Sequence, residues 1–248
     1  MAAPLLLISS SYVPQMPRSF LGYCHEEIRE FLGSTPSRLL FVPYAYPEHD
    51  EYTRRVHNTL SPLGAIVTGA HTAPSLTYED ITKSYDVVFC GGGNTFLLLS
   101  QLYERGLLGA IRKAVQNGVR YMGSSAGANV ACPTIGTTND MPIIEPKSHT
   151  ALGLVPFNIN PHYFDRPDGF KHMGESRFDR IREFVAFVKR PVLAMREGAL
   201  LCVRDDQFYL RGISDGIVFG WESAKARVNT TVVTSGQDIT RLLHSPKP

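Results

Sequence analysis

The segment from Gly123 to Gly127 reads GSSAG, which matches the pattern G-x-S-x-G and follows the apolar run VRYM. In this pattern a sharp strand-to-helix turn exposes the middle serine, and small neighbours are needed because larger residues would clash. The pattern therefore predicts a nucleophile at Ser125. Two other interpretations stay open, because such a pattern also arises by chance in loops rich in serine and glycine, and Ser124 could cap a helix.

A serine nucleophile needs a base that removes its proton, and histidine can supply that base. Eight histidines are present, and seven of them fall on polar helix faces, in loops or in the C-terminal tail. His162 differs because Pro161 fixes the backbone immediately before it and an apolar segment leads into it. This rigid setting favours His162 as the catalytic base.

An acid that could orient the histidine follows another apolar run, at Glu197 in the sequence Arg196-Glu197-Gly198. A carboxylate at the end of a strand and beside a glycine is placed to point into a cleft. The sequence alone supports equally well a solvated turn glutamate that pairs with Arg196.

A run of three glycines, Gly91 to Gly93, follows the apolar run VVFC and precedes a predicted helix. Three glycines let the backbone approach a ligand and direct free N–H groups toward it, and the helix N-terminus adds partial positive charge. The segment matches neither G-x-G-x-x-G nor a Walker loop. Asn94 or Thr95 could simply cap the helix.

These residues must be positioned by a scaffold in which short apolar runs alternate with longer amphipathic stretches. Unbroken apolar runs are typical of strands buried on both faces, and they occur at 5–8, 39–42, 65–67, 87–90, 119–122, 192–195, 200–203 and 216–219. Amphipathic stretches predict helices, among them 24–32, 52–60, 95–104, 107–116 and 177–189. The alternation predicts a doubly wound, mostly parallel α/β sheet flanked by helices, with some antiparallel strands near the C-terminus. Ligands of such sheets bind beyond the carboxyl ends of the strands, where the candidate segments lie.

Length, composition and charge limit the kinds of protein that this can be. Of the 248 residues, 43% are hydrophobic and 19% are charged, so we expect a single α/β domain over residues 1–248. The formal net charge is +2, with no long run of like charges, which argues against a nucleic-acid partner. The opening MAAPLLLISSSY lacks a basic segment and its apolar run is too short for a membrane span, so no membrane partner is expected.

Four cysteines at 24, 90, 132 and 202 are too widely spaced for a paired-cysteine zinc site or a dense disulfide framework. Cys90 and Cys202 lie inside apolar runs, as reduced core cysteines do. We therefore expect a cytoplasmic protein that needs no metal and no other cofactor.

Four segments together resemble a known family of peptidases. GGGNTFLLL, GSSAGANVACPTIGTTNDMPI, NINPHYFD and MREGALL occur in the order and at separations similar to those of peptidase E, the α-aspartyl dipeptidase family. The resemblance covers nearly the whole chain, including LLLISSS and LLFVPYA. It implies a fold like that of class I glutamine amidotransferases, with serine in place of their nucleophilic cysteine. It also implies a cytosolic serine exopeptidase that cleaves dipeptides and some short substrates with an N-terminal aspartate, without a metal.

The resemblance implies roles for the residues that match the family's motifs. Ser125 is then the nucleophile and His162 the general base. The motifs hold two candidate acids, Asp140 in TNDMP and Glu197 in REG. We prefer Glu197, because its strand-end position suits a cleft and the order nucleophile, histidine, glutamate is that of the similar amidotransferases, while Asp140 could support the site from a loop. Ser124 departs from the tryptophan of bacterial members, which leaves the elbow intact and bears on fine substrate preference.

The implied reaction is acyl transfer through an acyl-enzyme, which needs donors for the developing oxyanion. The backbone N–H of Ala126, directly after the nucleophile, and that of Gly93 in the glycine turn are the expected pair. An aspartyl side chain also calls for a cation, preferably arginine. For this cation Arg177 in GESR is the first candidate, and Arg166 and Lys171 are the next. Arg177 could instead be a solvated residue at the start of a helix. Asn94 is a further candidate contact with the substrate.

Two functions from other classes remain possible on the sequence. An α/β-hydrolase esterase would share the elbow, but its expected order is serine, acid, histidine, with an HGGG-type loop. A non-enzymatic module could use GGGNT as an anion- or nucleotide-binding turn and leave Ser125 inert. Labelling of the serine would separate the enzyme from the binding module.

Overall fold

Two β-sheets form the framework of the structure, a computed structural model that describes residues 3–73, 75–166, 169 and 173–244. The larger sheet has seven strands in the order β3-β2-β4-β5-β1-β8-β9. Strands β1 to β5 run parallel, whereas β8 is antiparallel to β1 and β9 is antiparallel to β8. The strands are β1 (Leu5–Ile8), β2 (Ser37–Val42), β3 (Ala65–Gly69), β4 (Val87–Cys90), β5 (Arg120–Ser124), β8 (Ala199–Arg204) and β9 (Gln207–Gly212).

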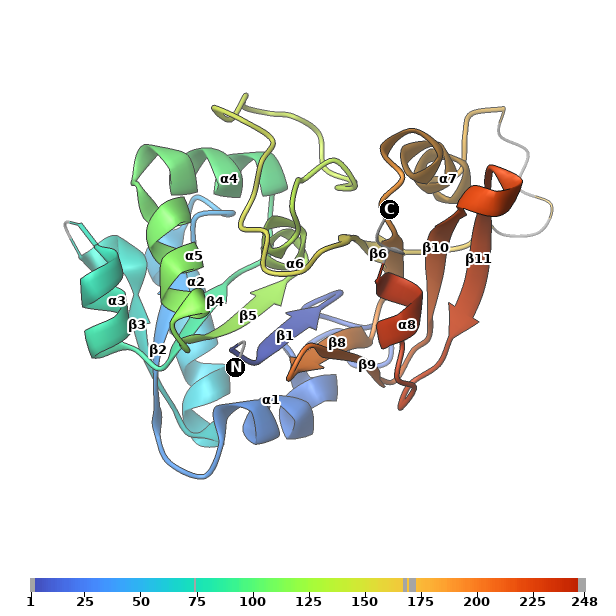
Figure 1. The fold of residues 1–248 in the computed structure, drawn as a ribbon. Helices are drawn as coiled ribbons and strands as arrows, with labels where there is room; N and C mark the ends of the chain where they lie inside the picture. The colour runs from blue at the N-terminus through green and yellow to red at the C-terminus, as the bar shows by residue number, and fades with distance from the viewer. Residues whose placement is uncertain (1–2, 74, 167–168, 170–172, 245–248) are drawn as a thin grey trace.

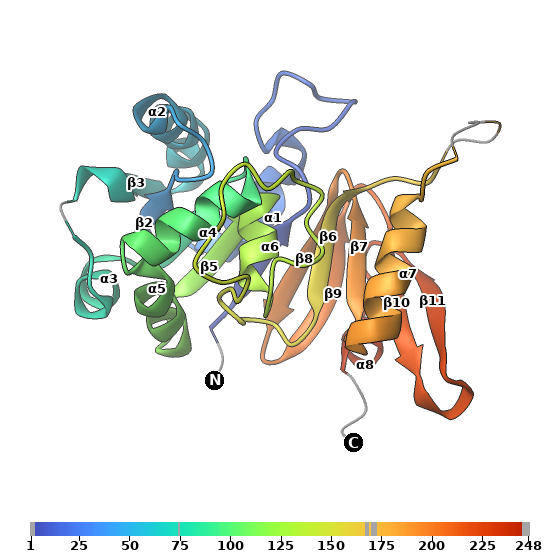
Figure 2. The same ribbon diagram turned by 90° about the horizontal axis from the view of Figure 1, so that it is seen from above.

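Helices cover both faces of the larger sheet (Figure 1, Figure 2). Successive side chains of a strand point to opposite faces, so Leu40 and Val88 pack toward α3, α4, α5 and α6, whereas Phe41 and Phe89 pack toward α1 and α2. This arrangement confirms the predicted doubly wound, mostly parallel α/β fold. The helices are α1 (His25–Leu32), α2 (His49–Leu60), α3 (Tyr78–Ser84), α4 (Thr95–Glu104), α5 (Leu107–Gln116) and α6 (Ala126–Ala131).

The smaller sheet has four strands in the order β11-β10-β7-β6, of which β6 and β7 are parallel and the others antiparallel. Its strands are β6 (Asn158–Tyr163), β7 (Val192–Arg196), β10 (Gly216–Glu222) and β11 (Arg227–Val233). Helix α7 (Arg177–Val188) packs on this sheet through Ile181 and Val185, and α8 (Thr240–Leu243) follows the last strand. The antiparallel strands expected near the C-terminus are present, and they are divided between the two sheets.

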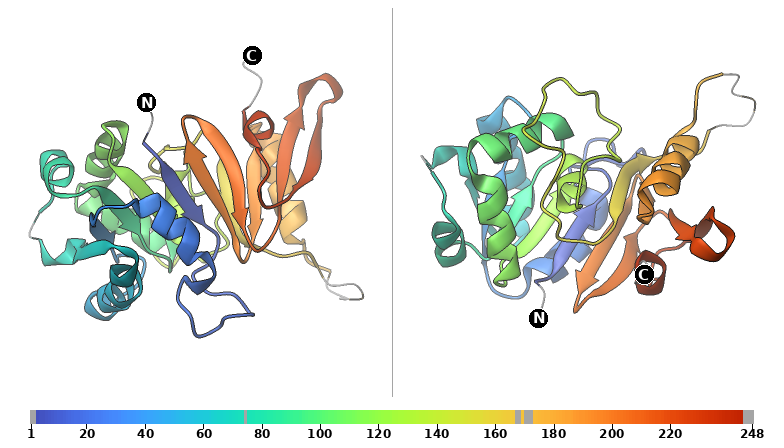
Figure 3. Two further views of the ribbon diagram at one scale, coloured as in Figure 1. Left: turned by 90° about the horizontal axis from the view of Figure 1, so that it is seen from below. Right: turned by 45° about the horizontal axis from the view of Figure 1, so that its top comes forward.

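The two sheets are joined where β7 passes into β8. Only Glu197 and Gly198 separate the end of β7 from the start of β8, and Figure 3 shows the smaller sheet beside the β8–β9 edge of the larger one. The carboxyl ends of β1, β4 and β5 point to the same edge because these strands are parallel. The residues that follow these three strands are therefore brought near one another, and Gly198, after β7, joins them through the hydrogen bond of its N–H to the Ser10 hydroxyl at 3.2 Å. This grouping was expected from the sequence for the segments after β4, β5 and β7, but not for the one after β1.

No helix in the part of the chain that the structure describes is both long enough and apolar enough to cross a membrane. Short 3₁₀ turns complete the structure at Gly22–Cys24, Ser61–Leu63, Ala70–Thr72 and Ser223–Lys225.

Candidate active site

Ser125 occupies a tight turn between β5 and α6. Its backbone has φ 52° and ψ −108°, a conformation that side-chain-bearing residues rarely adopt. A Cβ on Gly123 would lie 2.5 Å from the carbonyl oxygen of Gly127, and one on Gly127 would lie 2.0 Å from that of Cys90. Both flanking positions thus require glycine, and the structure has the strand, turn and helix that a nucleophile elbow needs.

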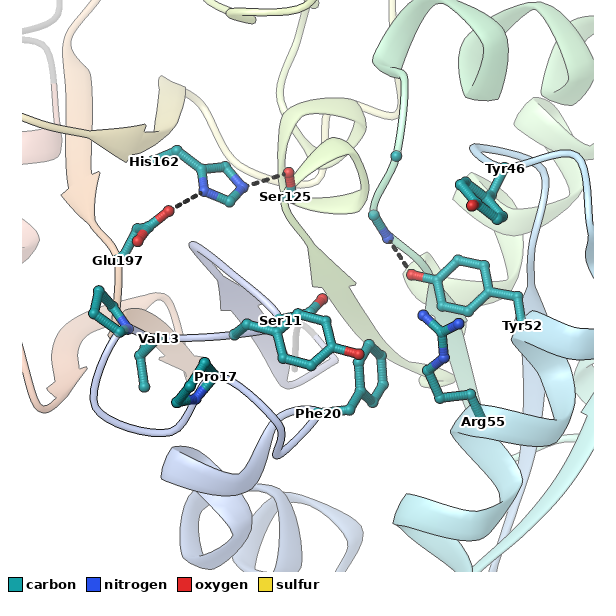
Figure 4. A pocket seen from close by; sticks show the side chains of 14 residues that line it. Ser11, Val13, Pro17, Phe20, Tyr46, Tyr52, Arg55, Ser125, His162 and Glu197 are labelled. Atoms are coloured by element: carbon teal, nitrogen blue, oxygen red, sulfur yellow. Dashed lines mark hydrogen bonds and ion pairs between the residues drawn. The ribbon is translucent and has the colours of Figure 1, made fainter.

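Ser125, His162 and Glu197 form a continuous hydrogen-bonded chain (Figure 4). The Nε2 atom of His162 lies 2.9 Å from Ser125 Oγ, and its Nδ1 atom lies 2.9 Å from Glu197 Oε1. A carboxylate can only accept a hydrogen bond, so Nδ1 carries the proton and Nε2 is free to accept that of the serine. The arrangement can therefore generate a serine nucleophile by general-base catalysis.

Asp140, the other acid considered, lies on the N-terminus of α4 and not on the histidine. It accepts hydrogen bonds from the Thr95 N–H at 2.8 Å, the Thr95 hydroxyl at 2.6 Å and the Thr138 hydroxyl at 3.2 Å. The neighbouring Asn139 donates to the carbonyl of Pro161 at 2.8 Å. This loop thus supports the backbone just before His162, and Asp140 holds the loop.

Gly93 and Ala126 are the two residues expected to supply N–H groups beside the serine: Gly93 lines the same pocket as Ser125, and Ala126 directly follows it. The N–H of Gly92 donates to the Tyr52 hydroxyl at 2.8 Å and that of Asn94 to the Ala45 carbonyl at 2.9 Å. Gly93, between them, has φ 134°, and a Cβ there would lie 2.1 Å from the Ala45 carbonyl oxygen. Ala126 is the first residue of α6, so its N–H has no acceptor within the helix. Within the described ranges neither N–H has a protein acceptor, as a site for an oxyanion requires.

A pocket of about 480 Å³ opens beside the serine. The rings of one phenylalanine and three tyrosines and one guanidinium are among the groups that line it. Tyr52 is buried, and burial raises the pKa of its phenol to about 12, although the hydrogen bond from the Gly92 N–H acts in the opposite direction. Among the described residues that line the pocket, most form an apolar wall and Arg55 is the one arginine; it also pairs with Glu51 at 3.3 Å. The lining residues are Ser11, Tyr12, Val13, Pro14, Pro17, Phe20, Tyr46, Tyr52, Arg55, Gly92, Gly93, Ser125, His162 and Glu197.

Arg177 lies close to the histidine but does not line this pocket. Its guanidinium donates to the backbone carbonyl of His162 and stands 4.3 Å from the ring centre of Phe164. Burial lowers the pKa of Arg177, and the nearby Glu197 carboxylate opposes that shift. The guanidinium is therefore placed to hold the strand end that carries His162.

The other predicted substrate contacts lie away from the pocket or outside the structure. Asn94 caps α4, since its side-chain oxygen accepts from the Leu97 N–H at 3.1 Å and its amide donates to the Met141 carbonyl at 2.9 Å. Arg166 donates to the carbonyl of Gly174. Lys171 lies outside the described residues.

Some residues that the structure brings into the site were not predicted from the sequence. Arg55 gave no signal, because an arginine on the polar face of an amphipathic helix is ordinary. Ser9, Ser10 and Ser11 directly follow the apolar run of β1, which is the position where ligand-binding residues of such sheets lie, so their run could have been noticed. Across the described part of the chain, no three His, Cys, Asp or Glu side chains are grouped so that they could hold a metal ion.

Comparisons with known proteins agree with the fold and identify the family. The family model for peptidase family S51 matches residues 5–211. The chain is 44% identical over 241 residues to a peptidase E of Streptomyces coelicolor, covering 96% of this chain and 94% of that protein. It is 43% identical over 244 residues to a probable α-aspartyl dipeptidase of Drosophila melanogaster, covering 98% of each.

Two solved structures share the fold. A peptidase from an acI-B1 actinobacterium superposes with a TM-score of 0.68 at 19% identity, covering 96% of this chain and 97% of that one. A putative peptidase E of Listeria monocytogenes gives a TM-score of 0.62 at 23% identity, covering 86% of this chain and 100% of that one.

Taken with the elbow, these matches make the protein a serine-type peptidase. The chain belongs to peptidase family S51. The family resemblance seen in the sequence motifs is thus confirmed, and neither the esterase nor the binding module is favoured.

Proposed function

We propose that this protein is an α-aspartyl dipeptidase in which Ser125 is the nucleophile, His162 the general base and Glu197 the acid that orients the base. The observation that carries the proposal is the chain of two 2.9 Å contacts from Ser125 Oγ through the imidazole to Glu197. The name of the Drosophila relative, a probable α-aspartyl dipeptidase, supports the substrate class. A small peptide with an N-terminal aspartate is then the partner, and no nucleic acid or membrane is involved.

The reaction follows from the protonation states of the triad. His162 Nε2 takes the proton of Ser125 as Oγ attacks the carbonyl carbon of the aspartyl residue, and Glu197 stabilises the imidazolium that forms. The imidazolium then gives the proton to the leaving amine as the peptide C–N bond breaks. Water, deprotonated by the same imidazole, hydrolyses the acyl-enzyme and releases aspartate.

The N–H groups of Gly93 and Ala126 supply the oxyanion site of this mechanism. Charge develops on the carbonyl oxygen only as the serine attacks, so donors fixed by the backbone stabilise the transition state more than the ground state. The glycine turn thereby has a catalytic role that requires no phosphate ligand. Asp140 acts indirectly, by holding the loop that supports Pro161.

For the aspartyl carboxylate we propose Arg55 as the partner, in preference to Arg177. Arg55 lines the pocket with Ser125, whereas the guanidinium of Arg177 is occupied by the His162 carbonyl. The leaving amine must lie near His162 to receive its proton, so the acyl residue extends along the Gly92–Gly93 side of the pocket, where Figure 4 places Arg55.

We further propose that residues 1–248 act as one α/β domain in the cytoplasm. The direct passage from β7 to β8 and the hydrogen bond from His162 N–H to Ser9 Oγ, 2.9 Å long, support the single domain. Four free thiols, three of them buried, support a reducing compartment.

The decisive experiment compares the unmodified protein with Ser125→Ala on dipeptides that vary only in the first residue. We expect Asp-Leu to be cleaved fastest, and Ser125→Ala to lose activity while still binding Asp-Leu, because only the attacking oxygen is removed. Steady-state hydrolysis and calorimetric binding measure the two effects. Undiminished turnover by Ser125→Ala would refute the serine mechanism.

A further inference from the structure

The pairing of β6 with β7 is irregular at His162. Asn160 pairs with Ala194 and Tyr163 with Arg196, so three steps along β6 match two steps along β7. Such a bulge interrupts the ladder of hydrogen bonds and re-aims a side chain. His162 lies in the bulge with φ 53°, in the left-handed region, and the bulge is what turns its imidazole toward Ser125.

The hydroxyl of Ser9 fills the gap that the bulge opens. It accepts a hydrogen bond from the His162 N–H at 2.9 Å and donates one to the Met195 carbonyl at 2.9 Å. Ser9 and Met195 are both completely buried, so water is kept away from the hydrogen bond between them. The Ser9 hydroxyl thus bridges the N–H of His162 in β6 and the carbonyl of Met195 in β7, at the point where the pairing of the two strands is irregular.

The backbone of Ser9 is itself held firmly. Ser9 directly follows β1, the central strand between β5 and β8, and its N–H donates to the Ala199 carbonyl at 3.0 Å. The adjacent Ile8 carbonyl accepts from the Ser125 N–H at 2.9 Å, and the Ser10 hydroxyl accepts from the Gly198 N–H at 3.2 Å. The end of β1 therefore contacts the backbone at or beside each member of the triad.

We propose that Ser9 is a positioning residue of the active site, whose hydroxyl fixes the β6 bulge and thereby places His162 between Ser125 and Glu197. The proposal rests on the proposed function, in which His162 is the general base. Without the hydroxyl, the part-buried His162 N–H and the buried Met195 carbonyl would both lose the hydrogen bonds that join them, which is costly enough to drive a local rearrangement. The bulge is the element that can shift, and a shift there displaces the imidazole.

The test compares Ser9→Ala with Ser37→Ala. Ser37 is a matched control, because it is also buried and its hydroxyl also bridges two partners, donating to the Leu32 carbonyl at 2.7 Å and accepting from Arg120 at 2.9 Å, away from the site. For Ser9→Ala we expect kcat on Asp-Leu to fall about 10- to 100-fold with KM within about threefold, since small misplacements impair catalysis. Ser37→Ala should keep kcat within about twofold. A folded Ser9→Ala with the kcat of Ser37→Ala would overturn the proposal.

A spectroscopic measurement separates this proposal from the proposed function, because it needs no substrate. The proton shared by His162 Nδ1 and Glu197 should give a low-field resonance in the proton NMR spectrum of the unmodified protein and of Ser37→Ala. In Ser9→Ala we expect it to shift or vanish, and an unchanged resonance would count against the positioning role even if Asp-Leu proved not to be the substrate.

A third measurement decides the matter if Ser9→Ala does not fold. Hydrogen exchange in the unmodified protein should show a strongly protected amide at His162, although that residue lies in an irregular part of its strand. Exchange at the rate of an exposed amide would show that Ser9 does not hold the bulge.

Discussion

Two residues proposed for catalysis adopt backbone conformations that their side chains disfavour. Ser125 has φ 52° and His162 has φ 53°, and each such conformation costs about 1 to 3 kcal/mol. Glycine would avoid that cost, but it has no side chain for catalysis. At both positions a reactive group must be turned out of a strand, and the surrounding hydrogen bonds offset the strain.

Exchanging each candidate acid for its amide tests which one completes the triad. Glu197→Gln removes the charge that stabilises the imidazolium, so we expect kcat on Asp-Leu to fall about 10²- to 10⁴-fold. Asp140→Asn should mainly lower the melting temperature, because Asp140 accepts three hydrogen bonds from threonines. Steady-state kinetics and thermal unfolding give the two readouts, and a severe kinetic loss confined to Asp140→Asn would reverse the assignment.

The specificity cation can be identified from the ratio of kcat/KM for Asp-Leu to that for Asn-Leu. The two side chains are nearly isosteric, so the ratio reports mainly on charge. Because Arg55 is partly exposed, its contact with a carboxylate is screened by water. We therefore expect Arg55→Met to reduce the ratio by about tenfold, which is a small effect for the loss of a charged contact. Arg177→Met should slow both dipeptides alike, since it contacts the His162 carbonyl. If only Arg177→Met compresses the ratio, Arg177 is the partner.

At the scale of elements, α6 crosses β4 so closely that it tolerates no side chain at one point. A Cβ on Gly127 would lie 2.0 Å from the Cys90 carbonyl oxygen. Because this oxygen belongs to the backbone of β4 and the Cβ would belong to α6, the clash could be relieved only by moving the helix or the strand. We expect Gly127→Ala to lower the free energy of unfolding by about 3 kcal/mol. Gly109→Ala on α5 is the control, because a Cβ there meets nothing within 4 Å, and it should stabilise by about 0.5 to 1 kcal/mol. Urea unfolding followed by circular dichroism measures both, and equal effects would disprove the close crossing.

The elements that the sequence predicted best are those with a strong apolar pattern. The bounds of α4, α5, β1 and β4 agree with the expectation, because their buried residues form unbroken runs or a clear helical face. The short α3 was not expected, since only Ile81 of its seven residues is buried.

Strands without a continuous apolar run were also missed. In β9 buried and exposed residues alternate, and β11 is a largely exposed edge strand, so neither resembles the doubly buried strands on which the prediction depended.

The candidate site was predictable to a different extent from the elements. Ser125, His162 and Glu197 each follow or interrupt an apolar run, so their chemistry could be recognised locally. Ser9 depends on the bulge in β6, which only the pairing with β7 defines. The location of Arg55 in the pocket likewise depends on how α2 packs, which a polar position in a helix does not indicate.

For the whole molecule, buried thiols make stability depend on alkaline pH. Burial raises the pKa of Cys90 and of Cys132 from 9.0 to about 12. Their folded pKa values exceed the unfolded ones, so their contribution is complete below about pH 9 and is lost as the pH rises toward 12. We expect the free energy of unfolding to fall over this range, and Cys90→Ala to make the slope shallower by about 1.4 kcal/mol per pH unit. Urea unfolding between pH 8 and 11 measures the slope, and an unchanged slope in Cys90→Ala would contradict the assignment.

The position of β1 also has a consequence for the order of events during synthesis. β1 is the first strand of the chain, yet its partner β8 begins at Ala199 and pairs Leu5 with Val203. Contacts so distant along the chain form late in folding and slow it. Ser125, synthesised midway, remains without its acid partner until the ribosome has added Glu197 and the strand beyond it. If the proposed triad is right, we expect the nascent chain to be inactive until its first and late strands have met.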